Sequence, residues 1–266
     1  MSADELEWQL AAFQYLLSEF GGLDQHRRSL LVNPDGEYFA DSVLTGHARA
    51  EQLLDEVKSI ADMAEWPTRL VPAAAAPGPQ HVSETLIIQS GTSAIGTYQL
   101  VADGMGGSLA EIRYDESLLD DLPALVATLA HELSHYLLST VRHSFPGGEE
   151  MHELLTDLTA TFLGFGIFLA NNARSHRSYQ HGLGSGWQSS HAGYLSERAL
   201  VTALVISERL AGRDPALAEP YLKPYLKSDL KLAMRWFARR DVDADVMAVS
   251  LADYQVEPFD ESSRDR

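Results

Sequence analysis

The sequence HELSH, residues 131–135, contains two histidines four positions apart, with a glutamate directly after the first. On a helix, His131 and His135 stack on one face, so their imidazoles can reach one metal ion at about 2.0–2.1 Å. Glu132 is rotated away from that face and reaches a water molecule on the metal instead. Zinc lowers the pKa of such a water to about 7, and a carboxylate beside it can take the proton. The spacing therefore predicts a metal site with its own base.

A catalytic zinc needs a third protein ligand, and the chain has no cysteine to supply it. After a Pro-Gly break a new helix is expected, and it offers Glu149, Glu150 and Glu153. Of these, Glu153 lies deepest in the helix and has Asp157 one turn further on. We therefore predict Glu153 as the third ligand. Asp157 is expected to accept the outer N–H of a ligand histidine, His131, and so to fix its tautomer.

HELSH followed by ELLTD resembles the gluzincin branch of the zincin metallopeptidases, in which HExxH on one helix and ExxxD on the next surround a zinc ion. The resemblance implies one zinc per chain, with Glu132 as the base and then the proton shuttle. It also implies a substrate-binding edge strand before the first helix, for which SLAEIRY (108–114) is the candidate. The 17 residues between the motifs are one or two fewer than in the thermolysin-like group. No exopeptidase signature is present.

These features predict a zinc-dependent peptidase that acts on a peptide or protein substrate. The alternative is a zincin-like module that keeps its metal for structure or for protein interaction and cleaves nothing. A glutamate at position 132 argues against this alternative, because a purely structural site has no use for a base. Peptide hydrolysis also needs a donor to the oxyanion. His191 and Tyr194 are the first candidates, followed by His181 and Tyr179, and all four fit equally well in a polar surface loop.

Composition restricts the partners. The chain has 20 Lys and Arg against 38 Asp and Glu, a net charge of −18, which disfavours nucleic acid and anionic membrane surfaces. The most apolar stretch, 154–170, is interrupted by Asp157 and predicts a buried helix, because a membrane span needs about 20 apolar residues. No secretory signal is visible at the N-terminus, so a cytoplasmic location is expected. The sequence does not indicate an oligomeric state.

The order of the elements predicts an α+β fold of the zincin type, with a small mixed or antiparallel sheet followed by a mostly helical lobe. Strands are expected at 85–89, 97–102 and 108–114, and helices at 4–20, 47–65, 118–140, 149–171, 194–211 and 223–240. The predicted division is an N-terminal helical segment 1–71, a linker or long loop 72–80, a zincin-like domain 81–240 and an acidic tail 241–266.

One further pattern lies outside the motif. The last predicted helix carries five basic residues at i, i+4 spacing: Lys223, Lys227, Lys231, Arg235 and Arg239. Such a stripe fits a solvated helix face near an acidic body, which is the preferred interpretation, and it also fits a docking surface.

Overall fold

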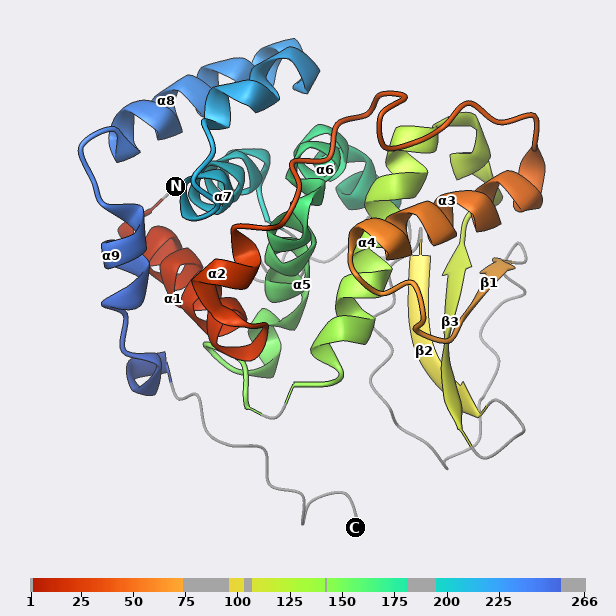
Figure 1. Ribbon diagram of the computed structural model, residues 1–266, viewed down its shortest axis with the longest axis horizontal. Coiled ribbons are helices and arrows are strands. Elements are labelled where there is room, and N and C mark those ends of the chain that lie inside the picture. Colours follow the sequence, from red (N-terminus) through yellow and green to blue (C-terminus); the bar gives the residue numbers. More distant parts are fainter. Residues whose placement is uncertain (1, 74–95, 103–106, 142, 181–194, 255–266) are drawn as a thin grey trace.

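The computed structural model describes residues 2–73, 96–102, 107–141, 143–180 and 195–254, and the side chains of 174–180 are outside the described set. A small sheet stands at one side of the molecule, beside helices α3 (Gly46–Ile60) and α4 (Leu122–Leu138). The remaining helices form the other side, with α5 (His152–Ala160) between the two groups (Figure 1). The α+β class predicted from the sequence is therefore confirmed.

The sheet has three described strands, β1 (Thr68–Pro72), β2 (Gly96–Ala102) and β3 (Ser108–Tyr114), in the order β1-β3-β2. Strand β1 runs parallel to β3, and β2 runs antiparallel to it, so the sheet is mixed. The prediction that 108–114 is an edge strand was wrong, because β3 pairs on both sides. Strand β1 was not predicted, since its five residues show no clear alternation. The strand expected at 85–89 lies outside the described residues.

The other helices are α1 (Ala3–Glu19), α2 (Gly22–His26), α6 (Gly166–Gln180), α7 (Glu197–Leu210), α8 (Lys227–Phe237) and α9 (Val242–Met247). Short polar side chains cap four of the helices: Ser2 on α1, Asp121 on α4, Ser196 on α7 and Asp241 on α9. A single buried apolar cluster includes residues of α1, α3, the sheet and α4 to α9. The N-terminal helices thus share a core with the rest of the chain, and the predicted domain limits stay a prediction.

The helix predicted at 149–171 is broken at Gly164, within a π-helical turn between α5 and α6. Gly164 has a φ of 104°, and a Cβ there would lie 2.2 Å from the carbonyl oxygen of Leu30. Its own carbonyl accepts a hydrogen bond from the amide of Val32 at 3.0 Å. The run Glu149–Ala173 has the length and apolarity of a membrane span, but 83% of its most apolar window is buried inside the fold. This run is therefore part of the core, and the prediction that its apolar stretch forms a buried helix is confirmed.

His26, at the end of α2, predicts a pH-dependent stability. Its Nε2–H donates to the carbonyl of Ser207 at 3.1 Å, and burial lowers its pKa to about 4. The unfolded chain binds this proton near pH 6.5, so the contribution of neutral His26 is present above pH 6.5 and is lost as the pH falls toward 4. The loss amounts to at most about 3 kcal/mol.

We expect His26→Gln to be less stable than the wild type at pH 7.5, with a gap that narrows as the pH falls to 4.5. Urea unfolding at several pH values measures the gap. Val205→Ala, a change at a buried apolar residue of α7, serves as the control and should show a gap that does not vary with pH, because neither side chain titrates. A gap for His26→Gln that is equally constant would contradict the prediction.

Candidate metal centre

Helix α4 carries the HELSH motif and is fixed at its start. The carboxylate of Asp121 accepts from the amide of Ala124 at 3.1 Å, and Pro123 occupies the first turn. Nearly every residue from Ala124 to Leu138 is buried, including His131, Glu132 and His135. Helix α5 packs against α4 and brings Glu153 and Asp157 to the same place. The motif therefore lies on a buried helix.

Three side-chain atoms converge between α4 and α5. The Nε2 atoms of His131 and His135 are 3.1 Å apart, and Glu153 Oε2 lies 3.3 Å from the first and 3.6 Å from the second. Ligand atoms in a tetrahedral zinc site with bonds of about 2.0–2.1 Å are about 3.3 Å apart. The separations in the protein match this value. Among the described residues these three form a group that could hold a metal ion.

The outer nitrogens of both histidines have partners that set their tautomers. His131 Nδ1–H donates to Asp157 Oδ1 at 3.1 Å. His135 Nδ1 lies 3.3 Å from the hydroxyl of Thr156, which in turn donates to the carbonyl of His152 at 2.9 Å. With both Nδ1 atoms protonated, two nitrogen lone pairs and a carboxylate oxygen face one another. A positive charge at the centre stabilises this arrangement, and in the absence of metal a proton on His131 supplies it. The donor set also fits zinc.

The histidines and carboxylates of the cluster shift one another's pKa values. Burial by itself would lower the pKa of His131, but the carboxylates of Asp157 and Glu153 raise it to about 10. Burial lowers the pKa of His135. Burial alone would raise the pKa of Glu153, yet the two histidines hold it well below its usual range. Glu153 is thus an anion beside two nitrogen donors, as a zinc ligand must be.

Glu132 stands beside the cluster without belonging to it. Its side chain is 1% exposed, and its Oε2 has no hydrogen-bond partner among the described residues. Burial raises its pKa to about 8. Strand β2 begins directly against it, since a Cβ on Gly96 would lie 2.6 Å from Glu132 Oε1. Glycine at position 96 therefore lets the strand approach the carboxylate closely, and the carboxylate is left available for a ligand.

The other predicted residues lie as follows. Glu149 and Glu150 are exposed in a short 3-10 turn before α5 and do not join the cluster. His181, His191 and Tyr194 lie outside the described residues, and the side chain of Tyr179 is also not described. The oxyanion donor stays a prediction.

Sequence reasoning missed two residues that contact His135, Thr156 and Tyr98. The Tyr98 ring lies parallel to His135, with ring centroids 6.3 Å apart, and its hydroxyl donates to Ser139 Oγ at 3.2 Å. His152 stacks on His135, with ring centroids 4.9 Å apart. For Thr156, the only hint in the sequence was its position directly before Asp157. Tyr98 could not be found from the sequence, because its contact with His135 depends on the register of the sheet.

No protein-family model, curated protein or solved structure matches this chain. A functional assignment rests on the geometry of the cluster and on the motif that carries it.

Asp157 joins the metal cluster to the start of α7. One carboxylate oxygen accepts from His131, and the other accepts from the amide of Leu195 at 2.9 Å. We expect Asp157→Asn to weaken zinc binding by about 10- to 100-fold, because an amide is a poorer acceptor for the imidazole N–H. Competition with a chromogenic chelator measures the affinity. Asn172→Asp, which changes a buried amide away from the cluster, is a control for general damage; equal affinity of Asp157→Asn and wild type would refute the role.

Proposed function

We propose that this protein is a zinc-dependent peptidase of the gluzincin type. The observation that carries the proposal is the position of Glu132, a buried carboxylate without a described partner, next to three converging ligand atoms. A site that held zinc only for structure would be closed by four protein ligands, whereas the described cluster supplies three. The arrangement has the parts that metal-assisted hydrolysis requires: a cation site and an adjacent base.

The residues divide the chemistry between them. A zinc ion held by His131, His135 and Glu153 would supply Lewis acidity, polarising a carbonyl oxygen and acidifying a water molecule. Its positive charge would also lower the pKa of Glu132, so that the carboxylate is ionised at neutral pH. Glu132 then accepts a proton as water attacks the scissile carbonyl, and it returns this proton to the leaving amine. Asp157 and Thr156 keep the two imidazoles oriented.

Strand β2 supports a peptide as the substrate. It is an edge of the described sheet, and its first residue, Gly96, abuts Glu132. A peptide that added to the outer edge of β2 would receive backbone hydrogen bonds and pass close to the base. The strand proposed for substrate is therefore β2, in place of β3.

The proposal is tested with quenched fluorescent peptide libraries and with unfolded casein as substrates. The protein is stripped with a chelator, assayed, then given one equivalent of zinc and assayed again. We expect cleavage that appears only after zinc is restored. Stoichiometric zinc binding with no cleavage in any library would favour the structural or interaction module and overturn the peptidase.

A further inference from the structure

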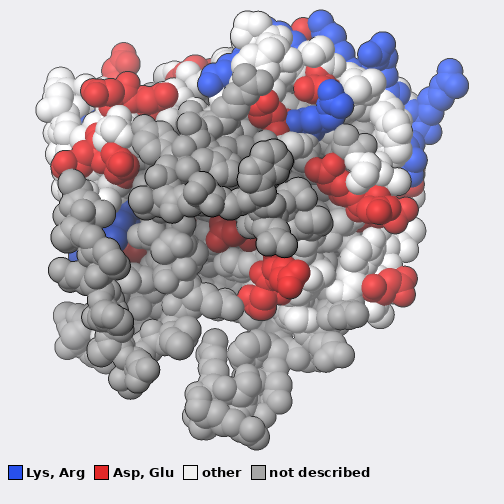
Figure 2. Space-filling model, turned by 180° about the vertical axis from the view of Figure 1, so that it is seen from behind, with Lys and Arg blue, Asp and Glu red and all other residues white. Residues whose placement is uncertain are grey.

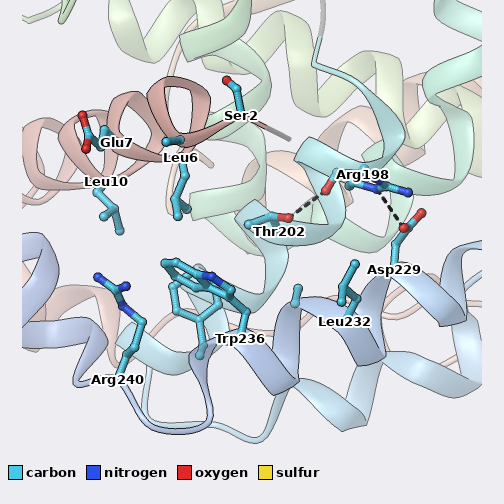
Figure 3. A pocket seen from close by; sticks show the side chains of 13 residues that line it. Ser2, Leu6, Glu7, Leu10, Arg198, Thr202, Asp229, Leu232, Trp236 and Arg240 are labelled. Atoms are coloured by element: carbon cyan, nitrogen blue, oxygen red, sulfur yellow. Dashed lines mark hydrogen bonds and ion pairs between the residues drawn. The ribbon is translucent and has the colours of Figure 1, made fainter.

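A second candidate surface lies on other elements, between the start of α1 and α8. It is a groove of about 520 Å³. Leu6 and Leu10 of α1 face Leu232 and Trp236 of α8 across it (Figure 3). Leu232 is 49% exposed and Trp236 45%, whereas Phe237 on the inner face of α8 is 1% exposed. Helix α8 therefore has two apolar faces, and the described part of the protein fully covers one of them.

Four charged residues line this groove: Glu7 of α1 adds a carboxylate on one side, and Arg198, Asp229 and Arg240 are paired within the protein. Arg240 lies over the Trp236 ring, 4.2 Å from its centroid, and forms an ion pair with Asp245 at 2.7 Å. Arg198 forms an ion pair with Asp229 at 3.0 Å (Figure 3). Since the guanidinium of Arg240 stacks on the indole, Trp236 is held in place before any partner arrives.

Two further arginines, Arg235 and Arg239, are sequence neighbours of lining residues but do not themselves line the groove. Arg235 follows Leu232 by three positions on α8, so the two lie side by side on the helix surface. Arg239 lies in the turn after α8, directly before Arg240, which lines the groove. Both are exposed, and neither has an acidic partner within the described ranges. Figure 2 shows Lys and Arg gathering at the corner of the molecule that α8 occupies, although the chain has a net charge of −18.

We propose that this groove docks an acidic segment of a partner protein that carries a bulky apolar side chain. The apolar side chain would fill the space between Leu10 and Trp236, and the carboxylates would pair with Arg235 and Arg239. Tryptophan and arginine are among the residues that most often dominate binding energy at protein interfaces, and here both occur at the end of α8 and in the turn that follows it. The charge is complementary only locally, because the rest of the surface repels acidic proteins. The proposal does not rest on the peptidase function.

The probe is a fluorescein-labelled synthetic peptide of about twelve residues with Leu and Phe at helical spacing and Glu at the other positions. Fluorescence anisotropy with the full chain measures its affinity. We expect Trp236→Ala, and separately Arg235→Glu with Arg239→Glu, to weaken binding by about tenfold or more. Lys223→Glu, at an exposed lysine four residues before α8 and outside the groove lining, is the control and should bind as the wild type does. A second peptide with Lys in place of Glu should bind at least tenfold more weakly than the acidic one.

Several outcomes would overturn the proposal. One is that the acidic peptide does not bind, or binds Trp236→Ala and Lys223→Glu equally well. A second is dimerisation in sedimentation experiments that Trp236→Ala abolishes, which would make a second copy of the chain the occupant. A third is a Phe259→Ala variant that binds the peptide more tightly than the wild type, since the chain's own acidic C-terminal segment would then be the competitor. Circular dichroism tests whether each variant is folded. We expect the variants at Lys223, Arg235, Trp236 and Arg239 to be folded, because these four side chains are exposed.

Discussion

We expect Glu132→Gln to leave the zinc content near the wild-type value and to lower the proposed peptide hydrolysis by about 10²- to 10⁴-fold. The amide has nearly the same size as the carboxylate, so it fits against Gly96 without moving β2. It cannot take a proton, however, and the attacking water loses its base. Zinc content by elemental analysis and initial cleavage rates on the same preparation measure both halves of the prediction.

Glu132→Asp is the matched comparison for this change. It retains a carboxylate but withdraws it by one carbon, so an activity between those of the wild type and Glu132→Gln is expected if the group acts as a base. Undiminished hydrolysis by Glu132→Gln would remove Glu132 from the mechanism. Loss of zinc from Glu132→Gln would mean instead that position 132 supports the metal site.

We expect His135→Ala to reduce bound zinc from about one per chain to nearly none, and the proposed hydrolysis should be lost with it. The two remaining ligands, His131 and Glu153, cannot close a zinc site against competing water. A ligand that binds only the folded state stabilises it, by about 2.7 kcal/mol at a hundredfold excess over its dissociation constant. Chelation should therefore lower the melting temperature of the wild type and leave that of His135→Ala unchanged.

Glu150→Gln provides the control for this experiment. Glu150 is exposed, lies three residues before Glu153 and was one of the alternatives for the third ligand. Its zinc content and its response to chelation should match those of the wild type. A His135→Ala protein that kept one zinc per chain would show that the ion binds elsewhere.

The parts of the site that sequence could predict are those that depend on helical periodicity. The spacing of His131 and His135 and the start of α4 at Asp121 follow from local rules, and the structure brings Glu153 and Asp157 to the same cluster. Thr156 was missed because its role depends on which way α5 is rotated against α4. Tyr98 was missed because it reaches His135 only through the packing of the sheet on α4.

The errors in the fold have a similar origin. The central position of β3 depends on β1, a five-residue strand that contributes little pattern of its own. The break at Gly164 depends on the carbonyl of Leu30, more than a hundred residues away in the sequence. Both contacts join residues that are far apart in the sequence, so local sequence patterns could not predict them.

The edge position of β2 has a consequence for the behaviour of the protein in solution. Within the described sheet, the outer backbone groups of β2 have no neighbouring strand, and an open edge of this kind can template the addition of any extended chain. Partly unfolded copies of the protein would therefore pair with the same row of backbone groups that the proposed peptide substrate would use. Aggregation during storage or heating should begin at this strand, and a tightly bound peptide inhibitor should act as a stabiliser against it.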